Sequence, residues 1–101
     1  MPKLLDEIHP GEVLLDDFMK PMILTARQLA ADIDVPQSRI SNVVNGKRPI
    51  SAETAVRLGI FFDMDPRFWV NLQAEYDTRM ATRSLRDSLV QRIGVFKRLT
   101  A

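Results

Sequence analysis

Apolar residues recur at helical spacing along most of the chain, and no segment of the first 80 residues shows the strict alternation of a half-buried strand. The first helix is predicted to begin at His9-Pro10, because proline fits the first helical position. The second begins at Thr25-Ala-Arg-Gln28, which matches a capping box. The third runs from Pro36 to Asn45-Gly46, where glycine suits the left-handed conformation that ends many helices.

Two more helices are predicted after this point. Ser51 is the expected N-cap of the fourth helix, and Asp65-Pro66 opens the fifth. Beyond residue 80 the pattern weakens: Ser84-Leu-Arg-Asp87 could cap a further helix, and Val95-Phe96 could form a short strand. We therefore predict an all-α fold, with one five-helix domain over residues 1–80. A basic C-terminal extension, either a helix or a strand, follows over residues 81–101.

Residues 25–45 read as two short helices joined by a tight turn. Ala30 is expected where the two helices cross, because a small side chain lets their backbones approach. Val35 in the turn and Ile40 in the second helix would fill the space between them. This arrangement predicts a helix-turn-helix. Its physical use is to hold the second helix away from the body so that it enters the major groove of DNA.

Several short motifs together resemble a known protein family. In the helix-turn-helix they are Thr25-x-Arg27-Gln28-Leu29-Ala30, Val35-x-x-Ser38-x-Ile40-Ser41 and Asn45-Gly46-Lys47-Arg48-x-Ile50, which are similar to the same segments of phage repressors and their relatives. Outside it they are His9-Pro10-Gly11-Glu12 and Phe68-Trp69-Val70-Asn71-Leu72-Gln73. With all of these motifs, residues 8–78 resemble the HigA antitoxin family, which includes proteins called virulence-associated protein I.

The resemblance implies a repressor-like fold and a cytoplasmic bacterial antitoxin. Members are encoded beside a small ribonuclease toxin of the RelE-like fold, bind that toxin, and repress their own operon as dimers. The implied partners are double-stranded operator DNA, a cognate toxin and a second copy of the chain. Two other functions remain open from the residues alone. One is a stand-alone transcriptional regulator without a toxin, and the other is a protein-interaction module that does not use its helix-turn-helix for DNA.

Helical geometry selects candidate DNA contacts around the third helix. The N-terminal turn of this helix points at base edges in this docking mode. Amide side chains suit adenine, hydroxyls suit several bases, and a guanidinium suits guanine. The candidates for base contacts are Gln37, Ser38, Arg39, Ser41 and Asn42. The candidates for phosphate contacts, near a helix N-terminus or at the end of the third helix, are Thr25, Arg27, Asn45, Lys47 and Arg48.

Charge is unevenly distributed, although the net charge is only +1. Residues 25–50 carry four bases against two acids, and residues 79–101 carry six bases against one acid. Residues 1–24 and 51–78 each carry five acids against two bases. A local excess of positive charge suits a polyanion such as DNA.

Composition narrows the possible chemistry further. Cysteine is absent, which excludes disulfides and thiolate metal sites, and His9 is the only histidine. No motif places a base beside a nucleophile, so we predict no enzyme activity, no cofactor and no metal site. No apolar run approaches the ~20 residues that a membrane crossing needs. We therefore expect a soluble, cytoplasmic protein with no membrane partner.

Overall fold

Helices are the only regular secondary structure in the computed structural model, which describes residues 8–97. The elements in chain order are α1 (Pro10–Val13), η2 (Leu14–Met19), α2 (Ala26–Asp32), α3 (Gln37–Val44), α4 (Ala52–Phe62) and α5 (Arg67–Leu89). Because α1 and η2 together form the first predicted helix, the prediction of a five-helix, all-α fold is confirmed. No helix in the described range is both long and apolar enough to cross a membrane.

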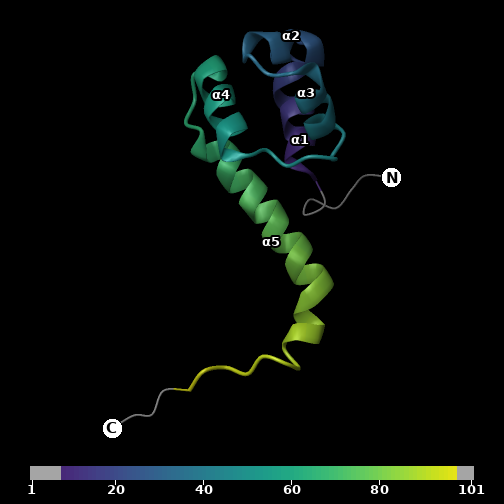
Figure 1. Ribbon diagram of the computed structural model, residues 1–101, viewed down its shortest axis with the longest axis vertical. Helices are drawn as coiled ribbons and strands as arrows, with labels where there is room; N and C mark the ends of the chain where they lie inside the picture. Colours follow the sequence, from purple (N-terminus) through teal and green to yellow (C-terminus); the bar gives the residue numbers. More distant parts are fainter. Residues whose placement is uncertain (1–7, 98–101) are drawn as a thin grey trace.

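The helices α1, α2 and α3 pack as one group, α4 lies beside this group, and α5 leads away from it (Figure 1). One hydrophobic core joins them, and its fully buried side chains include Leu14, Leu29, Ile40, Leu58 and Trp69. Trp69 on α5 packs against Phe18 of η2, with ring centroids 4.8 Å apart. The first turns of α5 therefore belong to the core, whereas its C-terminal half extends beyond the body (Figure 1).

The first helix widens from an α-helix into a π-helix partway along its length. The N–H of Lys20 donates to the carbonyl of Leu15 at 2.9 Å, a bond that spans five residues. In a regular α-helix the side chains of Leu14 and Met19 would point about 140° apart. The wider turn lets both of them be buried. Helical periodicity predicts the helix here but gives no sign of this widening.

α5 is one uninterrupted helix of 23 residues. The predicted cap at Ser84 is wrong, because Ser84 lies inside α5 and its hydroxyl donates to the carbonyl of Ala81 at 3.4 Å. The boundary predicted between residues 80 and 81 therefore falls within a helix. The sequence has neither glycine nor proline over residues 67–89, so no helix-breaking residue interrupts α5. Val95-Phe96, the alternative strand, forms no strand in the described part of the chain.

Candidate nucleic-acid interface

α2 and α3 form the predicted helix-turn-helix. The hydroxyl of Thr25 caps α2 by accepting the N–H of Gln28 at 3.0 Å, which confirms the predicted N-cap. Ala30 is buried, and its carbonyl accepts the N–H of Val35 at 2.9 Å. In the turn Asp34 has a φ of 60°, a left-handed conformation that aspartate tolerates better than most residues. These bonds fix the direction in which α3 leaves α2.

α3 buries one side and turns a polar side outward. Ile40 and Val43 are fully buried, whereas Gln37 and Ser38 are exposed and Ser41 is half-buried. At about 100° of rotation per residue, these three polar residues fall within one third of the helix circumference, on the side opposite the buried Val43. The outer face of α3, defined by Gln37, Ser38 and Ser41, is therefore open for contact with another molecule.

Asn42 and Arg39 lie beyond the Ser38 edge of this outer face, about 40° and about 100° farther round the helix. Asn42 is at its edge and half-buried. Arg39 lies farther round the helix, beside α4, where its Nη1 donates to Glu53 Oε1 at 3.0 Å and its side chain is only 19% exposed. Four of the five predicted base-contact residues thus share the outer face and its edge. Arg39 is instead turned into the packing between α3 and α4.

A chain of hydrogen bonds from α4 holds this flank of α3. Glu53 Oε1 accepts from Arg39 and also from Arg57 Nε, the latter at 3.1 Å. Arg57 Nη1 donates in turn to the carbonyls of Ile33 at 2.8 Å and Asp34 at 3.2 Å. α4 is thereby tied both to the start of α3 and to the turn that precedes it. The position of α3 consequently depends on this network.

The same two guanidinium groups stabilise the ionised form of Glu53. Their hydrogen bonds, first from Arg39 and then from Arg57, hold the pKa of Glu53 below its ordinary value of 4.5. The carboxylate is therefore ionised at neutral pH. Glu53 and Arg57 were not among the site residues predicted from the sequence, although their i, i+4 spacing on a predicted helix indicates an ion pair. Only the folded chain brings Arg39 to them.

The loop after α3 presents the two adjacent basic residues predicted to contact phosphate. Gly46 has a φ of 74° and ends α3 in the left-handed conformation that the sequence predicts. The N–H groups of Gly46 and Lys47 donate to the carbonyls of Val43 and Asn42 at 3.1 and 2.8 Å, respectively. This pair of bonds is the Schellman motif. It fixes the backbone from which the exposed side chains of Lys47 and Arg48 extend.

A buried glutamine on α5 anchors the far end of this loop. Gln73 is 6% exposed, its Oε1 accepts the N–H of Ile50 at 2.8 Å, and its Nε2 donates to Asp77 Oδ1 at 2.9 Å. The loop that carries Lys47 and Arg48 is therefore fixed at both ends, by the cap of α3 and by α5. The last residue of the Phe-Trp-Val-Asn-Leu-Gln motif acts by positioning this loop.

The His-Pro-Gly-Glu motif holds α1 against the C-terminal end of α3. Nδ1 of His9 accepts the N–H of Gly11 at 2.9 Å and caps α1, and the imidazole packs edge-on against Tyr76 with ring centroids 5.0 Å apart. Gly11 is buried against α3 so closely that a Cβ would lie 2.6 Å from the carbonyl carbon of Val43. This motif therefore supports α3 from the side opposite its outer face.

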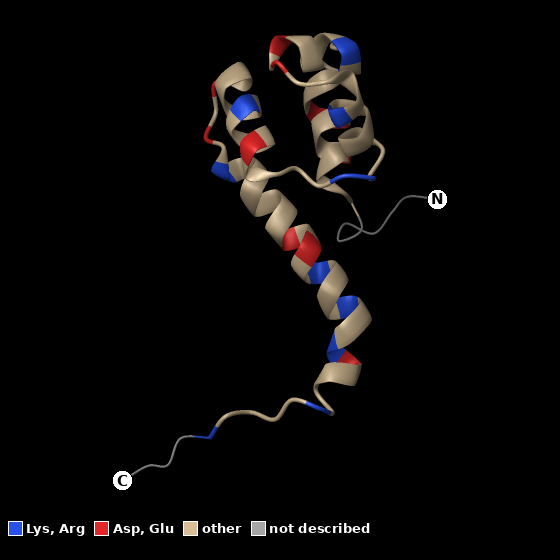
Figure 2. Ribbon diagram, viewed as in Figure 1, with Lys and Arg blue, Asp and Glu red and all other residues tan. Residues whose placement is uncertain are grey.

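Basic residues occur on α2, on α3 and in the loop that follows α3 (Figure 2). Thr25 and Arg27, at the start of α2, are exposed, and so are Asn45, Lys47 and Arg48 at the end of α3. All five predicted phosphate-contact residues are thus accessible. Two of them lie at the start of α2, and three lie at the end of α3 and in the loop after it. Each group can bind an anion through side chains or free N–H groups.

Comparisons with known proteins agree with this architecture. The family model HTH_3, described as helix-turn-helix, matches residues 15–69. Virulence-associated protein I of Dichelobacter nodosus is 46% identical over 74 residues, which are 73% of this chain and 68% of that protein. Antitoxin HigA of Pseudomonas aeruginosa, solved with the higBA promoter, has 34% identity and a TM-score of 0.87, and the alignment covers 90% of this chain and 99% of that one.

The chain belongs to the HigA antitoxin family of helix-turn-helix proteins. A second solved relative, antitoxin GraA in complex with its operator, has 34% identity and a TM-score of 0.84 over 100% of this chain and 99% of that one. Membership in the HigA family agrees with the prediction that the chain is not an enzyme. Among curated relatives the chain spans 68%, 63% and 60% of three matched proteins.

Proposed function

We propose that this chain is an antitoxin that binds operator DNA as a homodimer, represses its own operon and neutralises a small ribonuclease toxin of the RelE-like fold. The observation that carries the DNA-binding part is the outer face of α3, where Gln37 and Ser38 are exposed beside a loop fixed at both ends. Because bacterial operator DNA is in the cytoplasm, we place the protein there.

In this proposal α3 enters the major groove with its outer face against the base edges. The amides of Gln37 and Asn42 bond adenine N6 and N7 together, and such a bidentate contact discriminates between bases by about 1–3 kcal/mol. The hydroxyls of Ser38 and Ser41 bond bases directly or through water, because their side chains are short.

Arg39 contacts a base only if its ion pair with Glu53 is broken. Its guanidinium is held by Glu53 and mostly covered, so in the free protein it positions α3 rather than reaching outward. It contacts guanine or a phosphate only when DNA replaces Glu53 as its partner. Loss of Arg39 should therefore disturb the packing of α3 as well as DNA binding.

The phosphate contacts set register and affinity without reading sequence. Thr25 and the free N–H groups at the start of α2 take one phosphate, and Arg27 lies beside them. Asn45, Lys47 and Arg48 contact the phosphates of the DNA backbone at the other end of α3. Since these contacts do not depend on the bases, they strengthen binding to any DNA.

Two copies of the chain are needed for a stable operator complex. HigA of Pseudomonas aeruginosa and GraA were solved with a promoter and an operator, which supports a DNA partner for this relative. A two-fold axis places two copies of α3 in successive major grooves on one side of the duplex. The expected operator is near-palindromic, with half-sites about 10 bp apart or a multiple of that distance.

A fluorescence anisotropy titration tests the DNA-binding part. We expect tighter binding to the protein's own promoter than to scrambled DNA, with an affinity that falls steeply as salt rises. Equal affinity for both duplexes without a salt dependence would favour a protein-interaction module instead.

Co-expression with the neighbouring reading frame tests the toxin part. We expect the two products to purify as a stable complex and the growth defect caused by the neighbour to disappear. A neighbour that is neither toxic nor bound would leave a stand-alone regulator as the function. In the proposed complex a surface of the antitoxin buries the toxin or blocks its contacts with RNA or the ribosome.

A further inference from the structure

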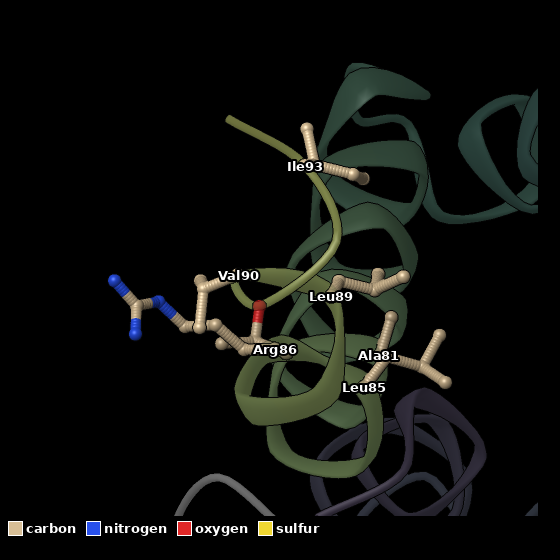
Figure 3. A pocket seen from close by; sticks show the side chains of 7 residues that line it. Ala81, Leu85, Arg86, Leu89, Val90 and Ile93 are labelled. Carbon is tan, nitrogen blue, oxygen red and sulfur yellow. The ribbon is translucent and has the colours of Figure 1, made fainter. Parts of the chain in front are cut away.

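Exposed apolar side chains gather on α4 as well as at the end of α5. On α5, Leu85 and Leu89 help to line a shallow groove along the helix (Figure 3), which a second copy of the chain, already part of the proposed function, can cover. On α4, Val56, Ile60 and Phe61 are 49%, 77% and 37% exposed. A surface helix normally carries polar residues on its solvent side. An apolar solvent side is typical of an interaction surface.

The apolar side of α4 adjoins the end of α2. Ile60 and Phe61 line a pocket together with the buried Ile33, and the exposed carboxylates of Asp32 and Asp34 lie beside it. The C-terminal end of α4 and α2 lie at one end of the molecule, and the segment after α5 lies at the other (Figure 1). We call this surface the α4 patch, defined by Asp32, Ile33, Asp34, Val56, Ile60 and Phe61.

The α4 patch does not suit DNA. None of the ten predicted DNA-contact residues lines its pocket, and its two carboxylates would repel phosphates. Arg57 also lines the pocket, but its guanidinium already donates to the carbonyls of Ile33 and Asp34 and to Glu53. The patch therefore fits a partner other than the operator.

Charge indicates the kind of partner. An enzyme that cleaves RNA has to bind phosphates, so it presents lysine and arginine side chains on its surface. Such a surface is attracted to the carboxylates of Asp32 and Asp34, and an apolar side chain within it can enter the pocket between α2 and α4. A second copy of the chain would instead bring its own carboxylates against them, and like charges repel.

We infer that the α4 patch is the surface that binds the ribonuclease toxin. An apolar toxin side chain lies between Ile33, Ile60 and Phe61, and basic toxin residues pair with Asp32 and Asp34. The inference rests on the proposed function and names the surface through which the antitoxin holds its toxin. Because the outer face of α3 is not part of this surface, changes in the patch should leave operator binding intact.

Calorimetric titration of the antitoxin with the purified product of the neighbouring reading frame tests the inference. Ile60→Ser removes the most exposed apolar side chain of the patch, and Asp32→Lys reverses a charge beside the pocket. Each should raise the Kd for that product by roughly tenfold or more. Neither change should destabilise the fold, because Ile60 is largely exposed and a lysine suits the last turn of α2.

Matched controls separate the patch from general effects of polarity and charge. Val95→Ser changes a side chain that is 87% exposed at the other end of the molecule, and Asp17→Lys changes an exposed carboxylate of η2. Both should bind the neighbour's product as the wild type does. The two patch variants should bind the operator at least as tightly as the wild type and should self-associate normally in sedimentation velocity.

Other outcomes overturn the inference. If the patch variants bind the neighbour's product normally, the toxin binds elsewhere, while the proposed function survives. If only Asp17→Lys loses the product, the toxin lies in the groove between η2 and α5 that Leu72 and Glu75 help to line. Weaker self-association of Ile60→Ser would show that a second copy covers the patch.

Two further results bear on more than the patch. If the patch variants lose operator binding together with toxin binding, these residues support the fold, and the inference fails. A wild-type chain that does not bind the neighbour's product at all would contradict the toxin part of the proposed function and this surface together.

Discussion

Gly11 of α1 lies against the backbone of Val43 in α3 with no room between them for a side chain. This contact sets how closely α1 approaches the C-terminal end of α3. The cap formed by His9 fixes the start of α1, so the approach cannot be relieved by a small rotation of the first turn. The position of the outer face of α3 therefore depends on a glycine that touches no DNA.

Replacing Gly11 with alanine should destabilise the fold by about 1–3 kcal/mol, because the added methyl group overlaps the Val43 carbonyl and α1 must shift. Urea denaturation followed by circular dichroism measures this loss. Gly94→Ala is the matched control, since a Cβ there meets no atom within 4 Å. Equal unfolding midpoints for the two variants would show that α1 can move freely relative to α3.

Gln73→Leu should weaken binding to promoter and scrambled DNA alike. It removes the acceptor of the Ile50 N–H, and a buried N–H without a partner costs about 1–3 kcal/mol. The loop with Lys47 and Arg48 then loses its anchor on α5. Anisotropy titrations with both duplexes measure the effect, and exposed Asn71→Leu on the same helix is the control. A loss confined to the promoter would contradict the assigned role of this loop.

Glu53→Gln should destabilise the protein at neutral pH and have progressively less effect in acid. The pKa of Glu53 is lowered in the folded chain by Arg39 and then Arg57, so its contribution is fully present above the ordinary value of 4.5. It is lost as pH falls through the folded-state pKa, where the wild type also becomes neutral. Urea midpoints of both proteins across this range measure the difference, and a deficit that persists in strong acid would contradict the network.

Lys47→Ala and Arg48→Ala should each weaken binding to all DNA sequences about equally. Each is expected to reduce the slope of log affinity against log salt by about 1, because one fewer phosphate is neutralised. Titrations at several salt concentrations measure the slope. Ser88→Ala, at the exposed end of α5, is the control and should leave the slope unchanged. A changed base preference with an unchanged slope would reassign these residues from phosphates to bases.

Most of the fold could be predicted from the sequence because the helix boundaries carry local signals. Thr25, Ser51 and Gly46 occupy the cap positions that their chemistry predicts. The end of α5 was not predictable in this way. Ser84 resembles a cap in isolation, yet with no glycine or proline nearby the helix continues through it.

The candidate site was only partly predictable. Gln37 and Ser38 face outward as helical periodicity indicates, because their position relative to Ile40 is local. The orientation of the Arg39 side chain depends on Glu53, fourteen residues away in the sequence. The position of the loop that carries Lys47 and Arg48 depends on Gln73. Such contacts arise from tertiary packing, and no spacing rule within one helix indicates them.

The most direct test of the account measures base discrimination by α3 itself. Wild type, Gln37→Ala and Asn42→Ala would be titrated against the operator and against duplexes with each half-site base pair changed in turn. We expect each variant to lose discrimination of about 1–3 kcal/mol at one or two base pairs and to keep it at the others. Variants that weaken every duplex equally, with the base preferences of the wild type intact, would contradict it.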